Sequence, residues 1–148
     1  MSEHPTDPGC IFCKIVAGQI PSFKVYEDDT VFAFLDIGPL VRGHTLVVPK
    51  AHHATVMEAP PEVLAGVNAR MPRLARAVLA ATGASACHVL VNNGPEAMQS
   101  VSHLHYHIIP RREGDRFSIP WNPQSLDKAE APALVSAMER ALRGAGGS

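Results

Sequence analysis

The chain has 148 residues, of which 46% are hydrophobic and 18% charged, and its formal net charge at pH 7 is -1. This length supports one domain with a sizeable core, and this composition excludes a disordered chain. A net charge near zero argues against general attraction to polyanions, so a phosphate would have to be bound by local groups. The sequence has no apolar run near the roughly 20 residues of a membrane span. Its first residues are polar and acidic, so we expect a cytoplasmic protein that binds neither nucleic acid nor membrane.

Three strands are predicted in the first third of the chain. We expect residues 1–9 to form a flexible tail. Apolar, β-rich runs then occupy Phe23–Tyr26 and Val31–Leu35, and the acidic residues between them predict a hairpin turn. A third run covers Thr45–Val48 and ends at Pro49, whose nitrogen cannot donate to a neighbouring strand.

After Pro61 the hydrophobic pattern takes a helical period. Apolar residues recur there at steps of three and four, at Leu64, Val67, Met71, Leu74 and Val78. Pro61 suits the first turn of a helix and Gly83 suits its C-terminal end. Pro72 falls inside this helix and is expected to kink it, because proline removes one backbone hydrogen bond.

Two further β-rich runs follow, in CHVLVNN and HLHYHIIP, and a last helix is predicted from about Lys128 to Arg143. Strands, one long helix and strands again predict an α+β fold with a mostly antiparallel sheet of about five strands and a C-terminal helix. Residues 113–148 are expected to form an irregular linker and a helix that packs on the domain.

Three histidines alternate along the second of these runs, at His103, His105 and His107. Alternate side chains of a strand share a face, so these imidazoles are predicted to face one way. The opposite face is then apolar and carries Leu104, Tyr106 and Ile108. Such a row suits either metal binding by neutral imidazoles or attack by one imidazole on a phosphorus or acyl centre. Nearby polar side chains favour phosphoryl chemistry, namely His44, Asn92, Gln99 and Ser100.

The segment from His103 to Ile109 resembles the signature His-φ-His-φ-His-φ-φ, with φ hydrophobic, of the histidine triad (HIT) family. Three longer segments resemble that family in the same order: CIFCKIVAGQIPSFKVYEDD, FAFLDIGPLVRGHTLVVPKAHH and NNGPEAMQSVSHLHYHIIPRR. Gln99-Ser100-Val101 is similar to the Hint branch, the nucleoside phosphoramidate hydrolases. The resemblance implies a HIT-like fold with its domain over residues 10–112.

The resemblance also implies a nucleotide hydrolase or transferase that works through a covalent intermediate. His105 is expected to attack the α-phosphate of a purine nucleoside phosphoramidate or a related nucleotide, and water then releases a nucleoside monophosphate such as AMP or GMP. The other catalytic residues implied are His107, His44 and Ser100. His107 and His44 would contact the phosphate or shape its pocket.

The nucleotide contacts implied by the resemblance come from loops as well as strands. Asn92, Gln99 and Ser100 would hold phosphate oxygens and the leaving group. Asp36 would accept from the ribose hydroxyls, with Ile37 against the base. Met98 departs from the family pattern, because many relatives have glycine at this position. A side chain there is expected to alter the phosphate loop, since glycine permits conformations that other residues resist.

The family further implies one structural zinc ion per chain, which the chemistry does not require. Its ligands would be Cys10, Cys13, His52 and His103, and two thiolates with two imidazoles form a closed tetrahedral set. His53 is adjacent to His52 and competes with it for this role.

Three other interpretations of the sequence stay open. The substrate could be a dinucleoside polyphosphate or an adenylylated metabolite. The chain could instead be a non-catalytic, nucleotide-binding regulatory protein, or a metalloenzyme that uses the triad itself as ligands. Relatives form homodimers by joining two sheets, so the resemblance also implies a homodimer.

Overall fold

The structure, a computed structural model, describes residues 4–145. It divides after Phe117 into two compact units. The first unit contains a sheet, two α-helices and one short 3-10 helix (Pro95–Ala97), and the second contains the helix α3 (Ala131–Gly144). No side chain of α3 is buried, and its apolar residues include Leu134, Val135, Met138 and Leu142. That this helix packs on the domain stays a prediction.

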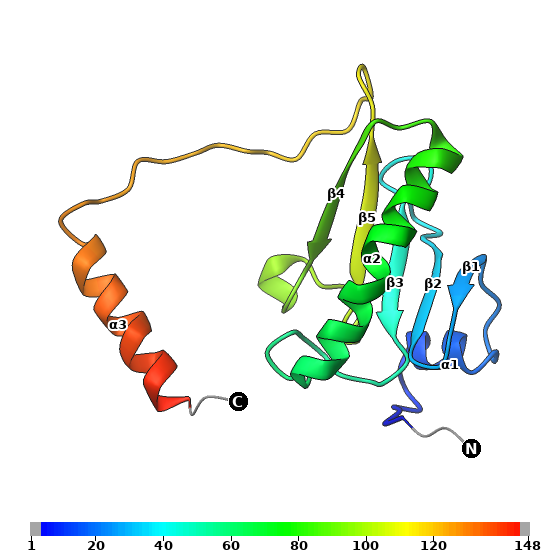
Figure 1. Cartoon of the computed structure of the whole chain (residues 1–148), viewed down its shortest axis with the longest axis horizontal. Helices are drawn as coiled ribbons and strands as arrows, with labels where there is room; N and C mark the ends of the chain where they lie inside the picture. The colour runs from blue at the N-terminus through cyan, green and yellow to red at the C-terminus, as the bar shows by residue number, and fades with distance from the viewer. Residues whose placement is uncertain (1–3, 146–148) are drawn as a thin grey trace. The chain divides into compact units, whose positions relative to one another are not determined.

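The first unit is built on one antiparallel sheet in the strand order β1-β2-β3-β5-β4 (Figure 1). The strands are β1 (Lys24–Glu27), β2 (Val31–Leu35), β3 (Thr45–Pro49), β4 (Ala86–Val91) and β5 (Tyr106–Arg111). This sheet, with its long helix, confirms the predicted α+β class and the predicted number of strands.

The helix α2 (Pro61–Thr82) lies across one face of the sheet and contacts β3, β4 and β5 (Figure 1). Its stripe at Val67, Met71, Leu74 and Val78 is buried, as the spacing predicts. Gly83 ends the helix in the left-handed conformation with φ 71°, which glycine adopts without the steric cost of a Cβ atom. The helix continues through Pro72, and the predicted kink stays a prediction.

A short helix, α1 (Ile11–Val16), was not predicted from the sequence. Cys10 caps it, because the backbone N–H of Cys13 donates to Cys10 Sγ at 3.4 Å. Phe12 and Ile15 pack with residues of β2 and β3 in a second hydrophobic cluster, among them Phe32, Phe34, Leu46 and Val48. With only 6 residues, α1 is too short to show a helical period in the sequence.

The predicted strand of three histidines is wrong in its extent. β5 begins at Tyr106, so His107 lies in a strand while His103 and His105 lie in the segment before it. The alternation itself holds, because the intervening residues Leu104, Tyr106 and Ile108 all join the core cluster beneath α2. His103 and His105 are only 0% and 3% exposed, and the ring of Phe12 meets both imidazoles edge-on.

The N-terminal residues 4–9 make contacts with two loops. The oxygen of Pro5 accepts from His52 N at 2.8 Å, and His4 Nε2 lies 2.8 Å from Asp29 O. Residues 1–3 of the predicted flexible tail lie outside the described residues. Within residues 4–145, no helix combines the length and the apolar character needed to cross a membrane.

Candidate functional site

A cavity of about 270 Å³ lies between α1 and the sheet. Its walls are mostly apolar and come from α1, β2 and β3, which supply Ile11, Phe12, Ile15, Phe34 and Leu46. Five of the predicted site residues line it as well, namely Asp36, Ile37, Ser100, His105 and His107. An apolar pocket with a few converging polar groups is the usual form of a small-molecule site.

His105 has one ring nitrogen fixed by the backbone. Its Nδ1 lies 2.6 Å from the carbonyl oxygen of His103. A carbonyl can only accept, so we assign the proton to Nδ1, which leaves the lone pair on Nε2. Burial lowers the pKa of His105, although the hydrogen bond to His103 and the charge of Asp36 act in the opposite direction. His105 is therefore a neutral imidazole with one unprotonated nitrogen, as a nucleophile must be.

His44 and His107 form a chain of hydrogen bonds whose direction the backbone sets. The N–H of Leu40 donates to His44 Nδ1 at 3.1 Å, so neutral His44 carries its proton on Nε2. His44 Nε2 lies 2.8 Å from His107 Nδ1, which therefore accepts. Neutral His107 must then carry its own proton on Nε2.

That N–H of His107 is the one unusual polar group of the cavity. Among the side chains of residues 4–145, His107 Nε2 is the buried nitrogen that has no hydrogen-bond partner. A buried donor without an acceptor is costly by about 1–3 kcal/mol. Because His107 lines the cavity, a bound anion could accept this hydrogen bond and remove that cost.

Burial keeps the two linked histidines neutral. Burial, together with the neighbouring His105 and His44, lowers the pKa of His107 to about 4. It also lowers the pKa of His44, against the opposing charge of Asp36. Asp36 Oδ2 lies 3.7 Å from His44 Nε2, farther than His107, while its Oδ1 accepts from the N–H of Gly38 at 2.8 Å. Asp36 thus adds a carboxylate to the cavity without protonating His44.

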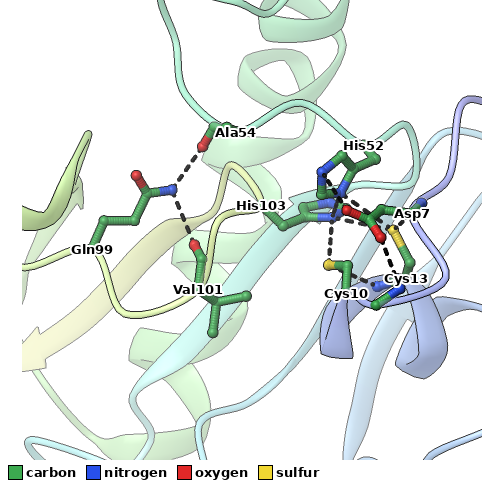
Figure 2. A network of polar contacts seen from close by, with 9 residues as sticks. Asp7, Cys10, Cys13, His52, Ala54, Gln99, Val101 and His103 are labelled. Carbon is green, nitrogen blue, oxygen red and sulfur yellow. Dashed lines mark hydrogen bonds and ion pairs between the residues drawn. The ribbon is translucent and has the colours of Figure 1, made fainter.

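Gln99 binds the main chain with both of its amide hydrogens. Its Nε2 donates to Ala54 O at 2.7 Å and to Val101 O at 3.0 Å (Figure 2). Its Oε1 accepts from Gly94 N at 2.8 Å. Gln99 therefore ties the loop after β4 to the loop after β3, and neither it nor Asn92 is among the described residues that line the cavity.

Met98 directly precedes Gln99 and has a left-handed backbone conformation. Its φ is 69° and its ψ 23°, and among the described residues it is the non-glycine residue with positive φ. The side chain is 81% exposed. The structure therefore explains the glycine of the family pattern by a turn with positive φ, and the Met98 side chain does not crowd the cavity.

A second group of side chains lies beside His105 and could hold a metal ion. Cys10, Cys13, His52 and His103 have ligand atoms that all lie within 4.8 Å of one another (Figure 2). His103 Nδ1 is 3.5 Å from Cys10 Sγ, 3.6 Å from Cys13 Sγ and 3.2 Å from His52 Nδ1. Ligands of tetrahedral Zn²⁺ at about 2.0–2.3 Å lie roughly 3.3–3.8 Å apart, so the four groups fit this ion.

The protonation of His103 also fits a metal site. Its Nε2 lies 2.8 Å from the oxygen of Pro49, which can only accept, so the lone pair is on Nδ1 and faces the two sulfur atoms. His52 Nε2 lies 3.8 Å from Asp7 Oδ2. His52, and not its neighbour His53, belongs to the group.

Sequence reasoning missed the residues that surround the reacting groups. The cavity walls from α1 were missed because that helix was not predicted. The amide of Leu40 and the carbonyl of His103 were missed because backbone groups carry no sequence signal. The alternation predicts that His103, His105 and His107 share one face. In the structure His103 joins the metal group, while His105 and His107 line the cavity.

Comparison with known proteins gives the same family as the sequence motifs. The HIT domain family model matches residues 17–114. The chain is 44% identical to adenylylsulfatase HINT3 of Arabidopsis thaliana over 137 residues, which are 90% of the chain and 69% of that relative. It is 43% identical to adenosine 5'-monophosphoramidase HNT1 of Saccharomyces cerevisiae over 122 residues, which are 82% of the chain and 75% of that relative.

A solved structure agrees with these relatives. A crystal structure of a zinc-bound histidine triad family protein from Mycobacterium smegmatis is 40% identical to the chain, with a TM-score of 0.71. The match covers 93% of this chain and 97% of the other. The chain belongs to the histidine triad family.

Proposed function

We propose that the protein is a nucleotide hydrolase that cleaves purine nucleoside phosphoramidates, or related nucleotides, at the α-phosphate. The observation that carries the proposal is the pairing of two ring nitrogens in one cavity. His105 Nε2 is unprotonated, and His107 Nε2 carries a proton and has no partner. The unprotonated nitrogen can attack phosphorus, while the free N–H donor can bind a phosphate oxygen and stabilise its negative charge. The names of two relatives, an adenylylsulfatase and an adenosine monophosphoramidase, support a nucleotide substrate.

The reaction proceeds in two displacements on phosphorus. His105 Nε2 forms a bond to the α-phosphorus, and the bond to the leaving group breaks with its electron pair on the departing atom, which takes a proton from water. His107 Nε2–H and the hydroxyl of Ser100 bind phosphate oxygens, where charge develops. Water then attacks the phosphorus and gives up one proton to the solvent. The bond between phosphorus and His105 Nε2 breaks with its electron pair on the nitrogen, and the nucleoside monophosphate is released.

The remaining predicted contacts concern the ribose and the base of the nucleotide. Asp36 accepts from the ribose hydroxyls and stays away from the phosphate, with which it would repel. Ile37, which is 87% exposed at the edge of the cavity, lies against the base. Gln99 supports the phosphate loop through its contacts with the main chain. Asn92 lies at the start of the same loop, directly after β4, and is not among the described residues that line the cavity.

We propose zinc as the ion of the Cys10, Cys13, His52 and His103 group, one per chain. Bound there it would cross-link the N-terminal segment, the loop after β3 and the segment before β5, and it would have no open position for a substrate. The zinc-bound relative supports this assignment. The chain's own residues perform the chemistry.

We also propose that the protein is a cytoplasmic homodimer. β4 is an outer strand of the sheet, and its Val89 is 43% exposed. An open strand edge with an apolar side chain is suited to pairing with a second copy. Sedimentation equilibrium of the native chain tests the dimer, and a monomer at micromolar concentration would contradict it.

The first experiment follows AMP release from an adenosine 5'-phosphoramidate. The native chain is expected to release AMP, and His105→Ala is expected to release none. Intact-mass measurement after rapid quenching should show the nucleotidylated protein for the native chain alone. The matched control is His88→Ala, which changes a histidine outside the cavity and should keep activity. Equal release by His105→Ala and the native chain would contradict the proposal.

A further inference from the structure

A second cavity of about 270 Å³ adjoins the first at its rim. The two cavities share Ile11, Ser100 and Val101 as lining residues. The rest of the second cavity comes from the N-terminal segment, the metal group and Ser102, which follows the shared residues. A ligand atom beside Ser100 therefore has access to both cavities.

The direction of the displacement points the leaving group toward that rim. In phosphoryl transfer the attacking and leaving atoms lie roughly in line on opposite sides of phosphorus. His105, the attacking residue, is 3% exposed and lies at the buried end of the first cavity. We therefore place the leaving group away from His105, on the side of Ser100, which is exposed and lines both cavities.

The second cavity has a carboxylate at its wall. Asp7 is its one carboxylate among the described residues, and its side chain is 51% exposed. Gly9 N donates to Asp7 Oδ1 at 2.7 Å, which fixes the orientation of the carboxylate. The hydroxyls of Ser100 and Ser102 add uncharged polar groups.

Neither cavity offers a cationic side chain of the kind that binds extra phosphates. Among the described residues, none that lines either cavity is a lysine or an arginine. A polyphosphate or sulfate leaving group would meet the negative charge of Asp7 without a compensating cation. A positively charged leaving group would be attracted, and the overall charge of -1 adds little to this local effect.

We propose that the second cavity is a leaving-group subsite that selects amines carrying a second, positively charged ammonium group. The inference rests on the proposed function and names its leaving group. Asp7 supplies the charge that attracts the ammonium, and the hydroxyl of Ser102 accepts a hydrogen bond from it. Asp7 is a specificity residue and takes no part in the attack by His105.

The test compares leaving groups of equal length and different charge. The probes are adenosine 5'-phosphoramidates whose leaving amine is a diaminoalkane or an aminoalkanol of the same chain length. For the native chain, kcat/KM is expected to be about two- to fivefold higher for the diaminoalkane, the range of an exposed ion pair. High salt should abolish this preference, because it screens exposed charges.

Variants of the subsite locate the effect. Asp7→Asn keeps the oxygen that accepts from Gly9 N and should make kcat/KM equal for the two amines. Asp29→Asn changes a carboxylate outside both cavities and should leave the preference for the diaminoalkane unchanged. Metal content is measured for each variant, because Asp7 lies near His52. Ser102→Lys is an independent variant that leaves the contacts of Asp7 in place, and it should reverse the preference and raise the rate with adenylyl sulfate.

Two failures can be told apart. AMP release by the native chain with equal rates for both amines, or a preference that survives both Asp7→Asn and Ser102→Lys, overturns the subsite alone. No AMP release from any of these substrates contradicts the proposed function, and the subsite falls with it.

Discussion

At the residue scale, the proton on His107 Nε2 distinguishes the site from an ordinary cluster of buried histidines. A chain of hydrogen bonds begins at the amide of Leu40, passes through His44 and ends at His107, which lines the cavity. The amide can only donate, so it sets the direction of every bond in the chain. Each ring in the chain accepts at Nδ1 and donates at Nε2. The last donor is thereby presented to a ligand without a positive charge on either imidazole ring.

Removal of that donor should slow the reaction more than it weakens binding. We expect His107→Ala to lower kcat by about 10²–10³-fold, the usual effect of one lost donor to developing charge. The Kd for AMP, measured by calorimetry with the same variant, should change less than kcat. A loss of kcat below about threefold would show that His107 does not contact the reacting phosphate.

Met98 makes a separate prediction about stability. A left-handed conformation costs a residue with a Cβ atom about 1–2 kcal/mol, and glycine avoids most of this cost. Met98→Gly should therefore raise the free energy of unfolding by about 1 kcal/mol, measured by urea denaturation. Ala97→Gly changes the preceding residue of the same turn, where no positive φ is present, and should lower stability instead. Destabilisation by Met98→Gly would contradict the account of this loop.

At the scale of elements, the His44–His107 hydrogen bond joins the loop before β3 to β5, which pairs with β3. The pKa of His107 is about 4 in the folded chain and about 6.5 in an unfolded one. Between these values the unfolded state binds more protons. The contribution of neutral His107 to the free energy of unfolding should therefore be fully present above pH 6.5 and should be lost as the pH decreases toward 4.

The contribution of His107 to this pH dependence can be isolated by substitution. His107→Gln removes the titrating group, so its unfolding free energy should fall less steeply between pH 6.5 and 4 than that of the native chain. Denaturant unfolding at several pH values measures both slopes. Identical slopes would show that His107 is not protonated on unfolding in this range.

The short helix α1 joins the two sites of the first unit. Cys10 and Cys13 belong to the metal group, while Ile11, Phe12 and Ile15 line the cavity. One turn and a half of helix thus presents sulfur atoms on one side and an apolar wall on the other. The wall includes Phe12, whose ring meets that of His105 edge-on at 5.1 Å between centroids.

At the scale of the whole molecule, the metal group joins the N-terminal segment to two loops, and its loss should affect stability before chemistry. We expect chelation, or Cys13→Ser, to lower Tm and to raise KM through α1, while turnover persists because no step uses the ion. Thermal unfolding and AMP release measure the two effects. Cys87→Ser, a cysteine outside the group, is the matched control. Loss of all turnover in a chelated but folded protein would support the metalloenzyme interpretation instead.

The sequence predicted the parts of the fold that repeat over many residues. The stripe of α2 and the alternation around Tyr106 are long enough to identify their elements, and both were found. The extent of β5 was predicted wrongly, because alternation of side chains continues through His103 and His105 without strand pairing. The residues around the reacting groups were predicted from the family motif, while α1 and the backbone partners of the imidazoles needed the folded structure.

The tautomers of His105 and of the His44–His107 pair are set by a carbonyl and an amide of the main chain, while the Asp36 carboxylate stays 3.7 Å from His44 Nε2. Every substitution except proline at position 40 leaves those two groups present as long as the loops keep their path. The walls of the cavity can therefore diverge among descendants without any change in which nitrogen is free to react. A site of this kind can keep one reaction while its substrates change. The chain is similar both to an adenylylsulfatase and to an adenosine 5'-monophosphoramidase, and the two names give different substrates.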